Sequence, residues 1–346
     1  MHRLVAGALA AVLGAPLLAR PAVAHQAPER GRQGGDPAPV LRTVADIPLP
    51  GPPVRFDQQS LDAGSDRLFI SHMGAGEIVV FNVKTRRVER TIGGLPGVTG
   101  VLSVHALGKV YASVTGLHQV AVIDAKTLRV VARLGPVDFP DALAYAPDQQ
   151  KIYVSDEMGG KLFVIHARTD SVEGSVPLDG EAGNTLFDPG SRCILVAVQT
   201  RNQVYAIDPA GERILGRFDL AGAARPHGMV IDAVRRLAFV ANESDATLLV
   251  VDLRMMRVNG TMRVGADPDV LAFDPLWRRL YVASESGVLS VFTETPTGVV
   301  HDGDVSFPHA HSVAVDPRTH LVYLPLQDVG GRPILRILAG EPPRER

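Results

Sequence analysis

The chain has 346 residues and a formal net charge of −2, so its length allows a large core, and its charge gives no support for the broad basic face of a nucleic-acid-binding protein. We therefore expect no nucleic acid among its partners. The single cysteine excludes an intramolecular disulfide, so the fold must be stabilised by burial and topology.

The first 24 residues have the pattern of a secretory signal peptide. A positive start precedes an apolar run from Leu4 to Leu18, and residues 22–24 form a small-x-small cleavage site. The run is short for a membrane span, although a retained anchor is the alternative. We expect cleavage after Ala24, a periplasmic or secreted protein, and no transmembrane segment in the mature chain. Residues 25–39 are rich in Gly, Pro and charge, which predicts a flexible linker.

A repeat fills the chain from residue 40 to residue 340. Each unit has one strongest strand with a large apolar residue at its centre. These anchor residues follow one another at steps of 42 residues, with one step of 44. Self-similarity at such a period is typical of propellers and other repeat folds. The seven anchors are Phe69, Tyr111, Tyr153, Leu195, Phe239, Tyr281 and Tyr323.

Within each unit the sequence predicts four short strands. An inner strand, such as residues 271–273, is often followed by an Asp-Pro turn and then by the anchor strand. A third and a fourth strand complete the unit, as at residues 248–252 and 258–264. Four short strands per unit make a propeller blade, so the predicted fold is an all-β, seven-bladed β-propeller. A transmembrane barrel would need longer strands and aromatic girdles, and only 5% of the residues are aromatic.

The last unit is incomplete, and a strand at the start of the repeat region has no unit of its own. The seventh unit offers three strands, at 311–315, 321–324 and 334–338, before a C-terminal tail at 341–346. We expect Val40–Leu49 to join it as the outer strand of blade seven. This pairing closes the ring and removes an open sheet edge. A closed ring needs no partner for its edges, so we expect a single domain at 40–340 and a monomer.

Several strands resemble a known family. Tyr153-Val154-Ser155-Asp156 and Phe239-Val240-Ala241-Asn242 are similar to the YVTN-type repeat of the YncE-like bacterial propellers. The resemblance extends over about residues 40–340 and implies seven blades and export. Members of this family have varied roles, among which single-stranded DNA binding has been proposed. The resemblance identifies no catalytic residue.

The repeat also brings distant residues to one end of the ring. Links between blades and turns between second and third strands open on the same face, where ligands usually bind to propellers. The position twelve residues before each anchor is expected to form a ring at the channel mouth. Its members are Asp57, Thr99, Asp141, Gly183, His227, Asp269 and His311.

A second ring is predicted three and four residues after each anchor. It adds further acidic and imidazole side chains to the same mouth. The predicted ligand-binding residues of the two rings are Asp57, His72, Asp141, Glu157, Glu243, Asp269 and Glu285. A purely structural role is the alternative for each, because Asp in such links often accepts backbone hydrogen bonds and Glu in turns is often solvated.

Three histidines are candidate metal ligands: His227, His309 and His311. Imidazoles that converge with carboxylates can hold one divalent transition metal, or can carry out acid–base chemistry without a metal. Two functions follow. The first is a binding module that captures a small molecule or a protein partner at the mouth, with or without a metal. The alternative is a metal-dependent hydrolase, lactonase or lyase at the same place.

Overall fold

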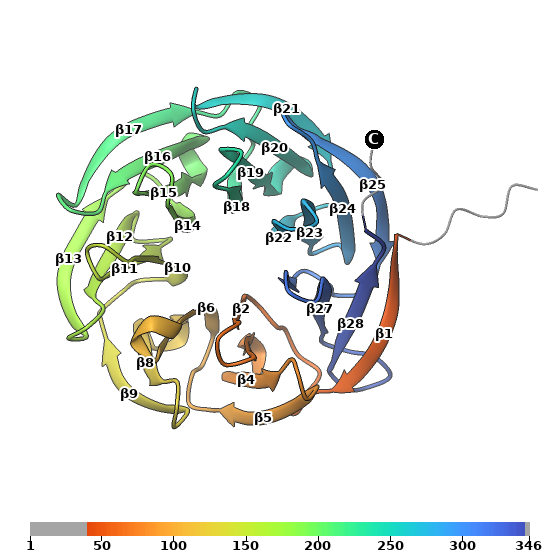
Figure 1. Cartoon of the computed structure of the whole chain (residues 1–346). Coiled ribbons are helices and arrows are strands. Elements are labelled where there is room, and N and C mark those ends of the chain that lie inside the picture. Colours follow the sequence, from red (N-terminus) through yellow and green to blue (C-terminus); the bar gives the residue numbers. More distant parts are fainter. Residues whose placement is uncertain (1–39, 343–346) are drawn as a thin grey trace, which may run out of the picture. The chain divides into compact units, whose positions relative to one another are not determined.

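The computed structural model describes residues 40–342, which form seven four-stranded antiparallel sheets arranged in a ring (Figure 1). This confirms the predicted seven-bladed β-propeller. The expected signal peptide at 1–24, the expected linker at 25–39 and most of the expected tail lie outside the described residues. In residues 40–342, no helix is long and apolar enough to cross a membrane.

Six blades are built from four consecutive strands, ordered from the ring axis outward. Short 3₁₀ turns join some of the strands, as at Met73–Ala75 (η1) and Gln199–Arg201 (η4). In blades one to three the strands are β2 (Gln59–Asp62), β3 (Arg67–His72), β4 (Glu77–Asn82) and β5 (Arg87–Ile92); β6 (Val98–Val104), β7 (Lys109–Val114), β8 (Gln119–Asp124) and β9 (Arg129–Leu134); β10 (Pro140–Ala146), β11 (Lys151–Asp156), β12 (Lys161–His166) and β13 (Ser171–Pro177).

The same order continues in blades four to six, where each third strand still pairs with both of its neighbours. The strands are β14 (Ala182–Asp188), β15 (Cys193–Val198), β16 (Gln203–Asp208) and β17 (Arg213–Asp219); β18 (Pro226–Asp232), β19 (Leu237–Asn242), β20 (Thr247–Asp252) and β21 (Arg257–Arg263); β22 (Pro268–Asp274), β23 (Arg279–Ser284), β24 (Val288–Glu294) and β25 (Val299–Ser306).

Blade seven combines the two ends of the domain, as predicted. It contains β26 (Ala314–Asp316), β27 (Leu321–Leu326) and β28 (Ile334–Gly340), and its outer strand is β1 (Leu41–Pro48). β1 runs antiparallel to β28, and Arg336 on β28 contacts Asp46 on β1 through two hydrogen bonds of 2.7 and 2.6 Å. The first strand of the domain therefore completes the last blade.

The anchor residues of the repeat form the core between blades. All seven are buried, with exposed fractions of 2% or less. In each blade the second strand, which carries the anchor, and the third strand are apolar on both faces, because the blade packs against a neighbouring blade on either side. The fourth strands alternate exposed and half-buried residues, because only one of their faces is covered. The residues that recur at the period of the sequence are therefore the ones that pack between blades.

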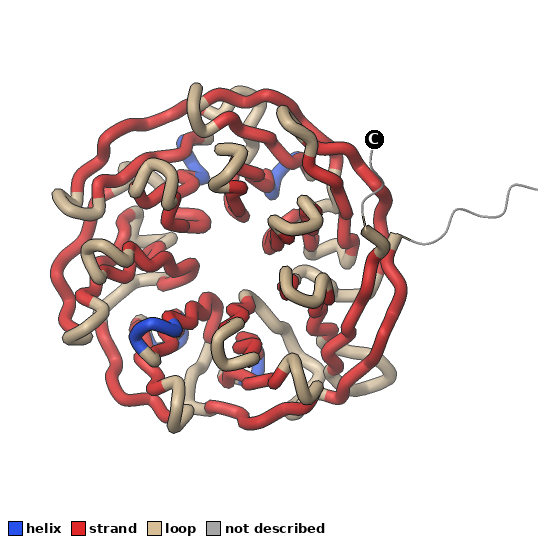
Figure 2. The backbone as a smooth tube through the Cα atoms, in the orientation of Figure 1, coloured by secondary structure: helices blue, strands red, loops and turns tan. Residues whose placement is uncertain are grey.

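The inner strands share an irregularity that positions the site. In blades two to six, the pairing of the inner strand with the anchor strand skips the residues twelve and eleven positions before the anchor. Blades one and seven begin regular pairing only after these positions. Residues that leave the ladder turn their side chains away from the pleat of the sheet. The tube view shows the inner strands around the central axis (Figure 2).

Candidate functional site

A cavity of about 190 Å³ lies among the inner strands and their adjoining loops. Seven acidic side chains line it against one arginine, Arg55. The acidic residues are Asp57, Asp141, Glu157, Glu243, Asp267, Asp269 and Glu285. Six of these seven belong to the two rings predicted from the repeat, so periodic spacing located this end of the ring correctly.

Five of the seven inner-ring residues line the cavity, and a sixth, His311, lies beside two of them. Thr99, Asp57, Asp141 and Asp269 lie in the wall together with His227. One donor atom from each of Asp57, Asp269 and His311 lies within 4.8 Å of the other two. These three residues come from blades one, six and seven, and only the closed ring brings them together.

Two predicted residues lie elsewhere. His309 is exposed in the loop before His311, with a left-handed φ of 61°, and is not among the residues of the cavity wall. His72 is fully buried; its ring stacks on Phe56 at 4.1 Å between centroids, and its Nδ1 lies 3.3 Å from Oε1 of Glu77. His72 therefore supports the loop that carries Arg55 and Asp57.

The carboxyl groups of the inner ring are buried close to one another. Burial raises the pKa of Asp57 well above its usual range, and the nearby Asp269 and Asp141 add to the shift. Burial also raises the pKa of Asp141 and of Asp269, although His227 opposes the shift in both. A bound cation would reverse these shifts because it stabilises the ionised carboxylates.

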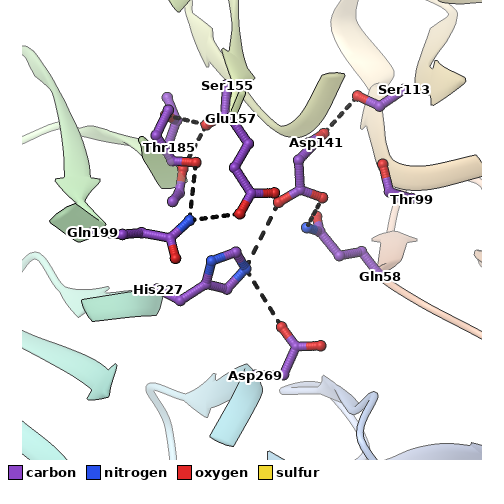
Figure 3. A network of polar contacts seen from close by, with 12 residues as sticks. Gln58, Thr99, Ser113, Asp141, Ser155, Glu157, Thr185, Gln199, His227 and Asp269 are labelled. Carbon is purple, nitrogen blue, oxygen red and sulfur yellow. Dashed lines mark hydrogen bonds and ion pairs between the residues drawn. The ribbon is translucent and has the colours of Figure 1, made fainter. Parts of the chain in front are cut away.

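His227 lies between the carboxylates of Asp141 and Asp269 (Figure 3), and Glu243 lies on the other side of its ring. Its Nε2 is 3.8 Å from Oδ2 of Asp141 and 3.6 Å from Oδ1 of Asp269, while its Nδ1 is 3.6 Å from Oε1 of Glu243. Burial opposes protonation of His227, but the three carboxylates outweigh it and raise the pKa. Burial lowers the pKa of His311, which favours the neutral imidazole that metals bind.

Several polar atoms of the site have no hydrogen-bond partner among the described residues. They are Oδ2 of Asp141, Nδ1 of His227 and Nε2 of His311, and all three are buried. Leaving a buried polar group unpaired costs about 1–3 kcal/mol. Such atoms at a cavity wall favour a site that is completed by a ligand.

Neighbouring residues hold the acidic wall in place. Ser113 Oγ donates to the main-chain oxygen of Asp141, and Gln58 Nε2 donates to its Oδ1 at 3.2 Å (Figure 3). On the other side, Gln199 Nε2 donates to Glu157 Oε1 at 2.9 Å, and Gln199 Oε1 accepts from Arg225 at 2.8 Å. These contacts fix the carboxylates before any ligand binds, which lowers the entropy cost of binding.

The sequence reading missed Arg55, although the repeat contains a signal for it. Arg55 contacts Glu285 at 2.5 Å and Asp269 at 3.7 Å. It stands fourteen residues before its anchor, and two residues at the same position of other blades, Phe139 and Asp267, also line the cavity. Extending the periodic comparison by two positions would have found all three.

Comparisons with known proteins agree with the fold. No protein-family model matches the chain. It is 32% identical over 100 residues to the uncharacterized proteins YncE of Salmonella typhi and Salmonella typhimurium, a match that covers 29% of this chain and 28% of each relative. These matches confirm the resemblance to the YncE-like propellers, over less than a third of the length of the curated relatives.

Among solved structures, a hydrazine synthase chain from Kuenenia stuttgartiensis is similar with a TM-score of 0.69 and 15% identity. The match covers 80% of this chain and 92% of that chain. At this identity the likeness establishes a shared fold alone.

Proposed function

We propose that this YncE-like β-propeller is a binding module that holds a divalent transition-metal ion at its acidic cavity and captures a small ligand or partner there. The observation that carries the proposal is the meeting of Asp57, Asp269 and His311, whose donor atoms lie within 4.8 Å of one another. Two carboxylates and one imidazole are a donor set that first-row transition metals accept. The excess of acidic side chains supplies the charge that attracts the ion.

Metal content and affinity test this proposal. Protein purified without a histidine tag is freed of metal, titrated with Zn²⁺ or Mn²⁺ in a calorimeter, and compared with His311→Ala and Asp57→Asn. We expect either substitution to weaken binding by about 10-fold or more, because each removes a ligand whose loss costs about 1.4 kcal/mol or more. Wild-type protein that binds neither metal would refute the proposal.

Arg55 offers a variant that should act in the opposite direction. Its guanidinium lies 3.7 Å from Asp269 and repels a cation at the same place. A charge at about 4 Å contributes roughly 1 kcal/mol or more, so Arg55→Gln should tighten metal binding about fivefold. Arg217→Gln is the matched control, because Arg217 lies on the outer strand β17 and contacts Asp179.

A metal-dependent hydrolase, lactonase or lyase at the same cavity is the second candidate. It is favoured by His227, whose pKa is raised by the surrounding carboxylates and whose ring lies 3.6 Å from Asp269. An imidazole beside a metal can transfer protons while the metal polarises a carbonyl or activates water. Turnover of ester or lactone substrates by the metal-loaded protein, lost in His227→Gln, would support this candidate over binding alone.

We also propose that the protein is exported. The support is the signal-peptide pattern of residues 1–24. Intact mass spectrometry of protein recovered from the periplasm or medium of a bacterial host should find a chain that begins at His25. Retention of the whole chain in the cytoplasm would contradict export.

A further inference from the structure

Asp141 and Glu157 differ from other acidic residues of the cavity because neutral amides hold their carboxylates. Gln58 Nε2 donates to Oδ1 of Asp141 at 3.2 Å, and Gln199 Nε2 donates to Oε1 of Glu157 at 2.9 Å (Figure 3). In the described part of the chain, no lysine or arginine forms an ion pair with either carboxylate. The two carboxylates are therefore fixed in place without a full counter-charge.

The cations of the cavity and its surroundings serve other carboxylates. Arg55 pairs with Glu285 at 2.5 Å, and Arg225 pairs with Glu243 at 3.3 Å. Burial opposes protonation of His227, but four nearby carboxylates outweigh it and raise its pKa. One imidazolium shared by four carboxylates leaves this end of the cavity negative.

Oδ2 of Asp141 is an acceptor that this end of the cavity leaves open. The atom is buried, has no hydrogen-bond partner among the described residues, and belongs to a side chain that is only 8% exposed. Its distance of 3.8 Å to His227 Nε2 exceeds the 2.7–3.2 Å of ordinary hydrogen bonds to nitrogen donors. Burial raises the pKa of Asp141, His227 opposes the shift, and the charge of Glu157 adds to it. A ligand with a positive charge and an N–H donor would satisfy both the charge and the open acceptor.

The chemistry of this end of the cavity fits a small organic cation better than a metal ion. Neither Asp141 nor Glu157 belongs to the group of donor atoms that lie within 4.8 Å of one another. Phe139, two residues before Asp141, also lines the cavity, and an aromatic face attracts an ammonium group and packs against a carbon chain. The cavity volume of about 190 Å³ is below the roughly 300–1,000 Å³ of pockets for drug-sized ligands, so a ligand of a few heavy atoms fits.

We propose that the ligand of this cavity is a small aliphatic primary amine, whose ammonium group binds between Asp141 and Glu157 and whose carbon chain packs on Phe139. This inference rests on the proposed function, because it names the class of ligand that the cavity captures. A primary ammonium has three N–H donors, which is enough for both carboxylates. Asp141 lies in β10 and Glu157 directly follows β11, both in blade three, whereas the proposed metal ligands come from blades one, six and seven. The amine and the ion therefore bind at separate places.

Calorimetric titration of the metal-free protein tests the class of ligand. The probe is n-butylammonium chloride, and 1-butanol and tetramethylammonium chloride are the comparisons. 1-Butanol has the same carbon chain without the charge, whereas tetramethylammonium has the charge without an N–H donor. We expect n-butylammonium to bind about 10-fold or more tightly than either comparison, because only it offers the charge and the donor together. Equal binding of n-butylammonium and tetramethylammonium would overturn the assignment to a primary amine.

Variants that keep the size of a side chain and remove its charge test the place of binding. We expect Asp141→Asn and Glu157→Gln each to weaken n-butylammonium binding by about 10-fold or more, and Phe139→Leu to weaken it about two- to fivefold. Asp219→Asn is the matched control, because Asp219 lies on the outer strand β17 and accepts a hydrogen bond from Gln203. Thermal unfolding shows whether each variant keeps its fold, and Glu157→Gln carries the test if Asp141→Asn does not fold.

Zn²⁺ titration of the same proteins separates this inference from the proposed function. We expect Asp141→Asn to keep its Zn²⁺ affinity within about threefold, and His311→Ala to lose Zn²⁺ but keep the amine. Wild-type protein that binds Zn²⁺ but not n-butylammonium, or Asp141→Asn that binds the amine like the wild type, would overturn the amine and leave the ion in place. Binding of the amine without any metal would refute the ion alone, and binding of neither would overturn both. A lysine-containing tripeptide that binds about 10-fold more tightly than n-butylammonium would overturn the small ligand in favour of a protein partner.

Discussion

Buried aspartates at the two ends of the inner strands differ in how their carboxylates are satisfied. Asp188 and Asp232 end their strands in turns, where they accept hydrogen bonds from Gly190 N at 2.9 Å and Val234 N at 2.8 Å. The pKa values of both are lowered. Burial by itself would raise them, but hydrogen bonds from arginine side chains and backbone amides, and from Ser191 in the case of Asp188, outweigh that effect. Asp57 and Asp269 lack such support and shift upward instead. The same residue type therefore has a lowered pKa in the turns at one end and a raised pKa in the cavity at the other.

Glu294 allows a prediction about pH at the residue scale. It ends β24, is 1% exposed, and lies 3.3 Å from Arg235. Burial and the neighbouring Asp232 raise the pKa of Glu294 to about 8. The folded protein therefore keeps a proton that the unfolded chain has lost above its ordinary pKa, which is about 4.3. Stability must then fall as pH rises between these two values.

Urea unfolding at pH 5.5 and 7.5 checks this prediction. We expect the unfolding free energy of the wild type to be lower at pH 7.5 than at pH 5.5, with about 1–2 kcal/mol of the difference due to Glu294, since one such group contributes at most about 1.4 kcal/mol per pH unit. In Glu294→Gln this contribution should be absent. Glu89→Gln is the control, because Glu89 is a surface partner of Arg67. Equal pH dependence in wild type and Glu294→Gln would contradict the assignment.

At the scale of the element, the inner strands depend on close contact between neighbouring blades. Gly228 follows His227 in β18 and lies against the main-chain oxygen of Asp269 in β22. A Cβ at this position would lie closer than 3.0 Å to that oxygen and to a methyl group of Leu271. Glycine therefore lets His227 and Asp269 approach each other, which links the packing of two blades to the geometry of the site.

Gly228→Ala should disturb both stability and the site. We expect a loss of about 1–3 kcal/mol in unfolding free energy, typical of overpacking, and weaker metal binding because Asp269 must move. Gly260→Ala is the matched control on the outer strand β21, where no atom lies within 4 Å of the added Cβ. Chemical unfolding and metal titration measure the two effects. Wild-type stability in Gly228→Ala would show that the contact is less tight than the structure indicates.

At the scale of the whole molecule, pairing between the first and last strands of the described repeat region closes the ring. β1 supplies the outer strand of blade seven; Leu41 at its start and Leu49, the residue after its end, are buried. The ends of the repeat region are therefore joined by hydrogen bonds between β1 and β28. Blades six, seven and one supply Asp269, His311 and Asp57, so closure also determines whether these three residues meet.

Deletion of residues 40–49 tests this dependence. We expect the midpoint of thermal unfolding to fall by about 5–15 °C, since a loss of several kcal/mol shifts a domain of this size by about 2–4 °C per kcal/mol. Deletion of residues 25–36 is the control and should leave the midpoint unchanged, because it spares β1. Equal midpoints in the two deletions would show that the ring does not need this strand.

Much of the molecule could be predicted from its period, because a repeat of 42 residues places equivalent residues of every blade in equivalent positions. The anchors from Phe69 to Tyr323, the closing strand and the acidic mouth all followed from that spacing. Side chains that depart from the pattern shared by the blades could not be predicted in this way. His72 turns inward onto Phe56, and His309 adopts a left-handed backbone that leaves it exposed. Periodicity gives a residue its place on the ring but not the direction of its side chain.

The sequence by itself determined the number of blades, their four strands and the end of the ring where acidic and imidazole groups gather. These features depend on alternation and spacing, which are local and repeated. Tertiary structure alone decided which groups meet: Asp57 with Asp269 and His311, and His227 with Asp141 and Asp269. The physical reason is that these contacts join blades far apart in the chain, and their distances depend on ring closure, on the irregular inner strands and on side-chain packing.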